Sequence, residues 1–241
     1  MALNLDNELF LVEDGKLSQY RGEDVSVTVP EGVIAIDEGV FLGHDELKEI
    51  ELPSTLLGIA ASAFEDCGLV RIDIPDSVRI IGEDAFYDCT ELEYAKLPSD
   101  LREIPDNMFA GCSYLDDVVI PDKVEHIGAE AFSACISLGS IVLPKSVKSM
   151  GENVFYNCLY LKSAIIKAPL KRIPKGTFYK CKEMTELELP ESLEYIGAES
   201  FAFCGALEDV RIGSAIREIA PTAFAECKKR IVMKYNKAVV E

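Results

Sequence analysis

The 241-residue chain contains no tryptophan and only two histidines, His44 and His126. The histidines are far apart in the sequence, and neither has a serine or cysteine in a nucleophile-like turn beside it. The patterns G-x-S-x-G, G-x-x-x-x-G-K-[ST], H-E-x-x-H and the EF-hand loop are all missing. Abundant carboxylates alone are weak evidence for acid–base catalysis. We therefore expect a protein that is not an enzyme and that uses no cofactor.

Long apolar runs are also missing. No window approaches the ~18 to 20 apolar residues that a membrane-spanning helix needs. The first residues, MALNLDNELFLVEDGK, lack the basic and apolar regions of a secretory signal, and no Asn-x-Ser/Thr sequon occurs. As written, the sequence predicts a soluble, cytoplasmic chain without membrane insertion. A mature fragment of a longer secreted or cell-surface protein would look the same, so that location stays open.

Basic residues are scarce: 24 Lys and Arg stand against 42 Asp and Glu, for a net charge of −18. Such a field repels nucleic acid phosphates and anionic lipid, and it favours basic partners. We expect no nucleic acid binding. A solvated acidic surface with no dedicated partner is the alternative. Acid pairs such as Asp116 and Asp117 lack calcium-loop spacing, so no metal site is predicted.

What the chain does have is an internal repeat. Nine phenylalanines recur every 23 residues, with one step of 22: Phe41, Phe64, Phe86, Phe109, Phe132, Phe155, Phe178, Phe201 and Phe224. Large aliphatic residues stand five and eight positions before each one, and proline usually stands eleven before. The unit reads L-x-x-I-x-L-P-x-x-V-x-x-I-G-x-x-A-F-x-x-C-x-x. One unit cannot bury its own apolar face, so the copies must stack into a continuous core.

The unit contains two predicted elements. L-x-x-I-x-L alternates apolar and polar residues, which predicts a strand with one side buried, and the proline ends it. The EDAF, AEAF and PTAF segments predict one short helical turn with acids near its N-terminus, where the helix dipole favours them.

This frame resembles the BspA-like leucine-rich repeats of bacterial proteins. The resemblance implies an α/β repeat solenoid, a horseshoe with a parallel, strand-lined concave face and short helical turns, built from about nine 23-residue repeats. It also implies a family often found at bacterial surfaces and associated with adhesion. We divide the chain into an N-terminal hairpin cap turning at Asp14-Gly15 (1–24), the solenoid (25–235) and a C-terminal tail (236–241). Arg230 replaces a core leucine, which predicts that stacking ends near Tyr235.

All eight cysteines follow a repeat phenylalanine by three residues, at positions 67, 89, 112, 135, 158, 181, 204 and 227. Zinc needs converging ligands, and disulfides need facing Cβ vectors. Equivalent side chains of stacked repeats run parallel and satisfy neither requirement. We therefore expect a ladder of buried, free thiols that behave as small apolar groups and react only on unfolding, with metal or redox use as the alternative.

The outward positions of the predicted strand lie four and two residues before the proline slot. In three consecutive repeats the second of these is apolar, and we call Val119, Val142 and Ile165 the apolar strip. Polar residues surround it, as in many protein interfaces. The predicted protein-binding residues are Tyr94, Lys96, Asp117, Val119, Ser140, Val142, Ser163 and Ile165. Alternatively, β-branched residues stand there because they suit strands, or the strip is a dimer interface.

The sequence therefore predicts a non-enzymatic protein–protein interaction module that binds a protein or peptide, favoured to be basic, on its concave face. The alternative is a structural spacer or adhesin fragment of a larger bacterial cell-surface protein. The sequence predicts no oligomeric state.

Overall fold

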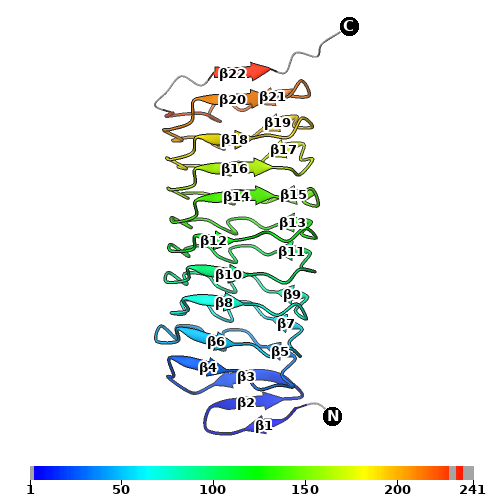
Figure 1. Cartoon of the computed structure of the whole chain (residues 1–241), viewed down its shortest axis with the longest axis vertical. Helices are drawn as coiled ribbons and strands as arrows, with labels where there is room; N and C mark the ends of the chain where they lie inside the picture. Colours follow the sequence, from blue (N-terminus) through cyan, green and yellow to red (C-terminus); the bar gives the residue numbers. More distant parts are fainter. Residues whose placement is uncertain (1–2, 228–231, 236–241) are drawn as a thin grey trace.

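The computed structural model describes residues 3–227 and 232–235. Its chain winds into a parallel β-solenoid of about nine turns, stacked in a nearly straight column with the termini at opposite ends (Figure 1). We number the turns by their phenylalanine, from turn 1 with Phe41 to turn 9 with Phe224. Each turn has three sides: a face of longer strands, a face of two-residue strands, and a phenylalanine loop.

The predicted repeat strands form the long-strand face. In chain order they are β4 (Ser26–Thr28), β6 (Glu49–Glu51), β8 (Arg71–Asp73), β10 (Tyr94–Lys96), β12 (Asp117–Val118), β14 (Ser140–Leu143), β16 (Ser163–Ile166), β18 (Glu186–Glu188), β20 (Asp209–Ile212) and β22 (Val232–Tyr235). Recorded pairs are parallel and in repeat register, as in Tyr94 with Arg71 and Leu187 with Ala164. Parallel strands at the predicted positions are confirmed.

The V-x-x-I segment forms a second face of short strands. These are β5 (Ala35–Ile36), β7 (Gly58–Ile59), β9 (Ile80–Ile81), β11 (Glu103–Ile104), β13 (His126–Ile127), β15 (Ser149–Met150), β17 (Arg172–Ile173), β19 (Tyr195–Ile196) and β21 (Glu218–Ile219). At the N-terminal end, β1 (Leu5–Asp6), β2 (Phe10–Glu13) and β3 (Lys16–Tyr20) are joined antiparallel, and β3 then pairs parallel with β5. The turn between β2 and β3 places Asp14 and Gly15 at positive φ.

The exact domain boundaries at residues 24 and 235 stay predictions. The proposed tail, 236–241, and Arg230 lie outside the described residues.

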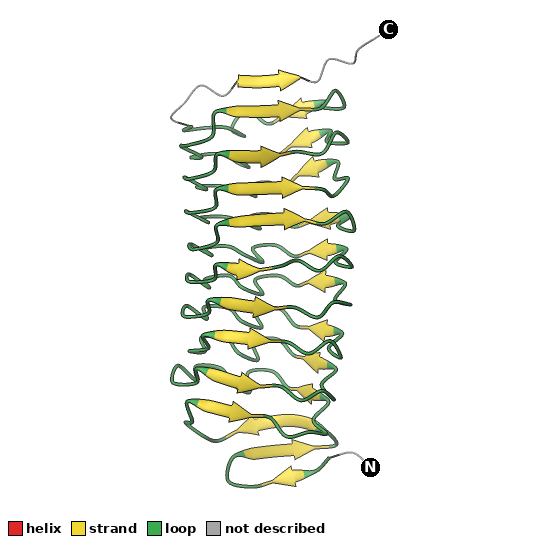
Figure 2. Cartoon of the chain, in the orientation of Figure 1, coloured by secondary structure: helices red, strands yellow, loops and turns green. Residues whose placement is uncertain are grey.

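The predicted helical turns were wrong. Figure 2 shows strands and loops, and no helix occurs in the described ranges. The reason is that alternate N–H groups of the phenylalanine loop bond to the next turn, and those between them form only turn bonds to the carbonyl three residues back, as Ser133 N–H does to Glu130 O. Phe132 N–H donates to Val154 O at 2.9 Å, and Glu130 N–H donates to Glu152 O at 2.9 Å. Glu130 has φ of 56°, which a helix does not allow.

The phenylalanines form the centre of the core. Rings of successive turns stack with centroids 5.0–5.6 Å apart, from Phe41 to Phe224. Those from Phe41 to Phe201 are fully buried. Each ring fills the space between its two neighbours, so the column has a continuous aromatic spine.

The cysteine ladder does more than fill space. From Cys89 onward, each thiol donates a hydrogen bond to the carbonyl of the phenylalanine one turn back, as Cys135 Sγ does to Phe109 O at 3.2 Å. All eight thiols are free. Burial raises the pKa of Cys67 to about 12 and that of Cys135 well above its usual value. The side chain at the cysteine position therefore fills a small space in the core and also donates a hydrogen bond.

Two prolines divide the short-strand face. In turns 5, 6 and 8 the N–H after the inward-facing isoleucine or methionine bonds to the turn before, as Gly128 N–H does to Ile104 O at 2.7 Å. Turns 4 and 7 carry Pro105 and Pro174 at this position, and proline has no N–H. The short strands accordingly fall into three separate blocks: β3-β5-β7-β9, β11-β13-β15 and β17-β19-β21.

The spine generates a stability prediction. Phe132→Ala should lower the free energy of unfolding by about 3–5 kcal/mol, because it opens a cavity between two stacked rings. Phe203→Ala is the matched control, since that ring lies outside the spine and is 37% exposed. Urea denaturation measures both. Equal losses for the two variants would contradict the central role of the spine.

The thiols generate a pH prediction. Unfolded thiols ionise near pH 8.5, whereas burial keeps the native thiols protonated to higher pH. Above about pH 8.5 the unfolded state therefore releases protons that the native state retains, and the free energy of unfolding falls. The loss reaches up to about 1.4 kcal/mol per pH unit for each buried thiol. Denaturation from about pH 7 to 10 tests this. Cys135→Ala should show a shallower pH slope than the wild type, and an unchanged slope would refute it.

Candidate binding face

The predicted binding residues all lie on the long-strand face. Three register pairs connect six of them: Tyr94 with Asp117, Ser140 with Ser163, and Val142 with Ile165. Lys96 ends β10, and Val119 follows β12 directly. These positions come from β10, β12, β14 and β16, which follow one another along the column (Figure 1).

The apolar strip is open to solvent. Val119 is 74% exposed and Val142 is 40% exposed, while Ile165 is half-buried. The residue just before each strip residue points inward, since Val118, Ile141 and Ala164 are buried. Alternation on a pleated strand produces this division, because successive side chains point to opposite sides.

Polar contacts border the strip on both sides. Towards the N-terminus, the Arg71 guanidinium lies 5.0 Å from the centre of the Tyr94 ring and also pairs with Asp73. Towards the C-terminus, Ser163 Oγ donates to Glu186 Oε2 at 2.6 Å. The face therefore has an apolar centre and a charged, hydrogen-bonded rim.

Sequence reasoning missed two exposed tyrosines near this face. Tyr114 and Tyr160 are 60% and 57% exposed and lie at the corners that lead into β12 and β16. Those strands carry the two ends of the strip. The corner position, two residues after the cysteine, holds Glu91 and Glu183 in the flanking turns. The change from acid to tyrosine was the available signal.

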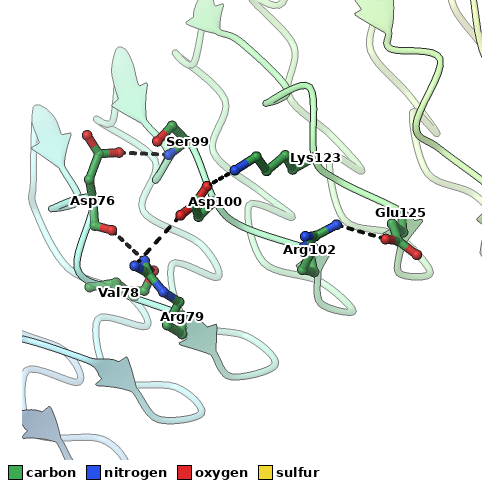
Figure 3. A network of polar contacts seen from close by, with 8 residues as sticks. All are labelled: Asp76, Val78, Arg79, Ser99, Asp100, Arg102, Lys123 and Glu125. Carbon is green, nitrogen blue, oxygen red and sulfur yellow. Dashed lines mark hydrogen bonds and ion pairs between the residues drawn. The ribbon is translucent and has the colours of Figure 1, made fainter.

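A charged network covers the corner between the long and short strands of turns 3 to 5 (Figure 3). Asp100 lies between Arg79, at 3.8 Å, and Lys123, while Arg102 Nη1 contacts Glu125 Oε1 at 2.9 Å. The hydrogen bond and charge of Lys123 lower the pKa of the Asp100 carboxyl. These contacts link successive turns.

The histidines form no site. His44 packs against the rings of Tyr20 and Phe41, while the His126 Nδ1 atom lies 2.7 Å from Ser149 Oγ on the short-strand face. Across residues 3–227 and 232–235, no three potential ligand side chains gather as a metal site would require. Nor do these ranges form a helix that could span a membrane.

Comparison with known proteins identifies the family. The model of the BspA type leucine-rich repeat region, in six copies, matches residues 20–135 and 102–230. The chain belongs to the BspA-type leucine-rich repeat family. Leucine-rich repeat proteins of this kind typically take part in protein interactions or act at cell surfaces.

Solved structures share this fold. A leucine rich cell surface protein of Faecalibacterium prausnitzii A2-165 matches with a TM-score of 0.57 and 26% identity, over 89% of this chain and 60% of that one. A leucine-rich repeat protein of T. pallidum matches with a TM-score of 0.60 and 29% identity, over 85% and 91%. The pneumococcal vaccine antigen PcpA, at 21% identity and a TM-score of 0.56 over 89% and 69%, supports the fold alone.

The BspA-type chain thus spans 60% of the length of the Faecalibacterium protein. A search of curated proteins gives no significant match.

Proposed function

We propose that this protein is a non-enzymatic binding module whose apolar strip receives a protein or peptide. The observation that carries the proposal is the exposure of apolar side chains in three consecutive turns, with Val119 at 74%. Interfaces commonly combine such a centre with a polar rim and with tyrosines. Tyr114 and Tyr160 supply the tyrosines in the outer two of these turns.

Strand preference explains this face less well. β-Branched residues suit a pleated, half-buried surface, which accounts for Val142 and Ile165 within β14 and β16. Val119 lies just beyond β12, and the two tyrosines lie in corners outside the strands. A preference for extended backbone gives no reason for large exposed side chains at those three positions.

The charges beside the strip favour a partner with a basic rim. Asp117 lies on one side, and Glu186 and Glu188 lie on the other, all exposed, while exposed Lys96 is the one cation among the predicted binding residues. Opposite charges around an apolar centre speed encounter and select partners more than they add affinity. We therefore propose a ligand segment with apolar residues in the middle and lysine or arginine at its ends.

A second candidate function is a spacer or adhesin segment within a longer surface protein. The 26%-identical Faecalibacterium relative is named as a cell surface protein, and this chain spans 60% of its length. A straight column of uniform turns with termini at opposite ends would separate flanking segments (Figure 1). This similarity favours a surface location over the cytoplasmic one expected from the sequence.

A paired pull-down tests the strip. The baits are the wild type, the variant Val119→Asp/Val142→Asp/Ile165→Asp, and the matched control Ile34→Asp/Leu57→Asp/Ile80→Asp. The control residues are also apolar, 39%, 52% and 71% exposed, and located in turns 1 to 3. Lysate and culture supernatant of the source organism supply the prey, and thermal melting first verifies that all three baits are folded.

The expected prey binds the wild type and the control and is lost from the strip variant. The fraction that supplies it also reports the compartment. Recovery of every prey by the strip variant would overturn the proposed binding face. A wild type that captures nothing specific would favour the spacer.

A further inference from the structure

The net charge of −18 hides a strongly basic segment. Residues 131–182 contain nine Lys and Arg but one acid, Glu152, so the segment carries +8 and the rest of the chain −26. Most of these cations are exposed. They are Lys145, Lys148, Lys162, Lys167, Lys171, Arg172, Lys175, Lys180 and Lys182. None of them lies in β14 or β16, so a ligand meets this local field, of the opposite sign to the average, at the corners, loops and short strands of these turns and not on the strip itself.

Four of these cations line one groove. It has a volume of about 650 Å³ and lies at the corner between turns 6 and 7. Lys145 and Lys148 come from turn 6, and Lys171 and Arg172 come from turn 7. Buried Val147 and Leu170 and half-buried Met150 supply apolar lining.

Two prolines of turn 7 explain why the groove lies here. In the neighbouring turns, a hydrogen bond closes the corner after the long strand. The N–H of the buried valine or leucine donates to the carbonyl of the proline three residues earlier, as Val147 N–H does to Pro144 O at 3.2 Å. In turn 7 the proline is displaced to Pro169, and Leu170 N–H bonds to Ala168 O at 2.8 Å instead. Pro174 then removes the N–H that would join the short strands, and β15 and β17 belong to separate blocks.

The break of the short-strand face at Pro105 can be compared with the break at Pro174. Between turns 3 and 4, Asp100 sits beside Arg79 and Lys123 and compensates their charge (Figure 3). The frame position of Asp100 is Ser146 in turn 6 and Pro169 in turn 7. At the second break, Lys148 and Lys171 occupy the frame positions of Arg79 and Arg102, whereas Pro169 replaces Asp100 and Ser192 replaces Lys123.

The polar groups of the groove have few partners of their own. Lys148 and Lys171 pair outward, with Glu125 in turn 5 and with Glu194 in turn 8. Among the described residues, Lys145 and Arg172 form no ion pair, and the buried Ser146 Oγ has no hydrogen-bond partner. Arg172 lies over the Tyr195 ring at 5.7 Å, which leaves its N–H donors available.

We propose that this groove binds a short acidic peptide segment that also carries apolar side chains. Its carboxylates would face Lys145, Lys171 and Arg172, where arginine can hold a carboxylate by two hydrogen bonds. Its apolar side chains would cover Met150 and Pro169, the apolar lining residues that are accessible to solvent. Exposed ion pairs contribute little, so Lys148 and Lys171 can exchange their present partners for the ligand.

The surroundings favour a short peptide over a long polyanion. A nucleic acid that filled the groove would run onto Glu125 on one side and Glu191 and Glu194 on the other. Its regular phosphates would meet repulsion there, and they would leave the apolar lining uncovered. A peptide ends before these acids and offers both kinds of side chain.

The site can be tested with a fluorescein-labelled peptide of alternating glutamate and leucine. Fluorescence anisotropy measures its Kd with the wild type and with Lys145→Gln/Lys171→Gln. The matched control, Lys162→Gln/Lys182→Gln, removes the same charge from exposed positions of the same segment outside the groove. We expect the groove variant to raise Kd by about tenfold and the control by less than about twofold. Methyl NMR of the wild type should show shifts at Val147 and Leu170.

Three outcomes would overturn the proposal: no saturable binding of the peptide to the wild type, equal weakening in both double variants, or methyl shifts away from the groove. Tighter groove-dependent binding of a single-stranded oligonucleotide would replace the peptide with a polyanion. Groove-dependent dimerisation in sedimentation would identify a second copy as the occupant. Because the groove and the apolar strip have separate variants, failure of this site leaves the strip to be judged alone.

Discussion

The hydrogen bond from each turn to the next is the interaction on which this structure depends. On the phenylalanine loops, an N–H such as that of Phe132 meets a carbonyl of the following turn, Val154 O at 2.9 Å. A bond of this kind requires equivalent loop residues to stay in register, and the loops recur every 23 residues, with one step of 22. Register then stacks like upon like, so the aromatic spine and the thiol ladder follow from the backbone pairing. Cys135 adds a side-chain bond in the opposite direction, to Phe109 O of the preceding turn.

The need for hydrogen bonds between turns also explains why proline is tolerated at some positions of the repeat and interrupts strand pairing at others. At the end of a long strand, Pro144 O accepts the corner bond from Val147 N–H; where this slot holds Lys167 instead, its N–H donates to Leu143 O of the turn before. After a short strand, Pro105 and Pro174 remove the donor that joins adjacent turns, and the short-strand face separates there into blocks. The first separation is bridged by Asp100 and its cations. At the second, Pro169 stands in the place of the acid, and the groove is found there.

The sequence predicted the parallel strands and the outward direction of Val119 and Val142 because alternation and repeat length determine both. It failed at the phenylalanine loop. The EDAF and AEAF segments have helix-like composition, but in a stacked array the neighbouring turn satisfies the N–H of Glu130 at 2.9 Å. Helix propensity depends only on the local sequence, so it does not include the competing hydrogen bonds to the neighbouring turn. The groove escaped prediction for a related reason: the role of Pro174 is visible only beside turns in which a glycine N–H makes the bond. The net charge of the whole chain did not reveal the basic segment, because acidic residues elsewhere in the chain outnumber its cations.

Both candidate sites occur in turns 5 to 7, and the architecture gives a reason for such clustering. Stacking fixes the residues at core slots such as Phe155 and Cys158 because each must fit two neighbours, so recognition chemistry is confined to outward positions and corners. At such a position, a substitution in one turn changes a single surface site. Substitutions at the same position of consecutive turns form a continuous surface, because neighbouring turns are about 4.8 Å apart. Val119, Val142 and Ile165 build an apolar surface, and Lys145, Lys148 and Lys171 build a cationic one. Most acids lie in the turns on either side, so an acidic ligand would be repelled there and attracted to the cationic corner between turns 6 and 7.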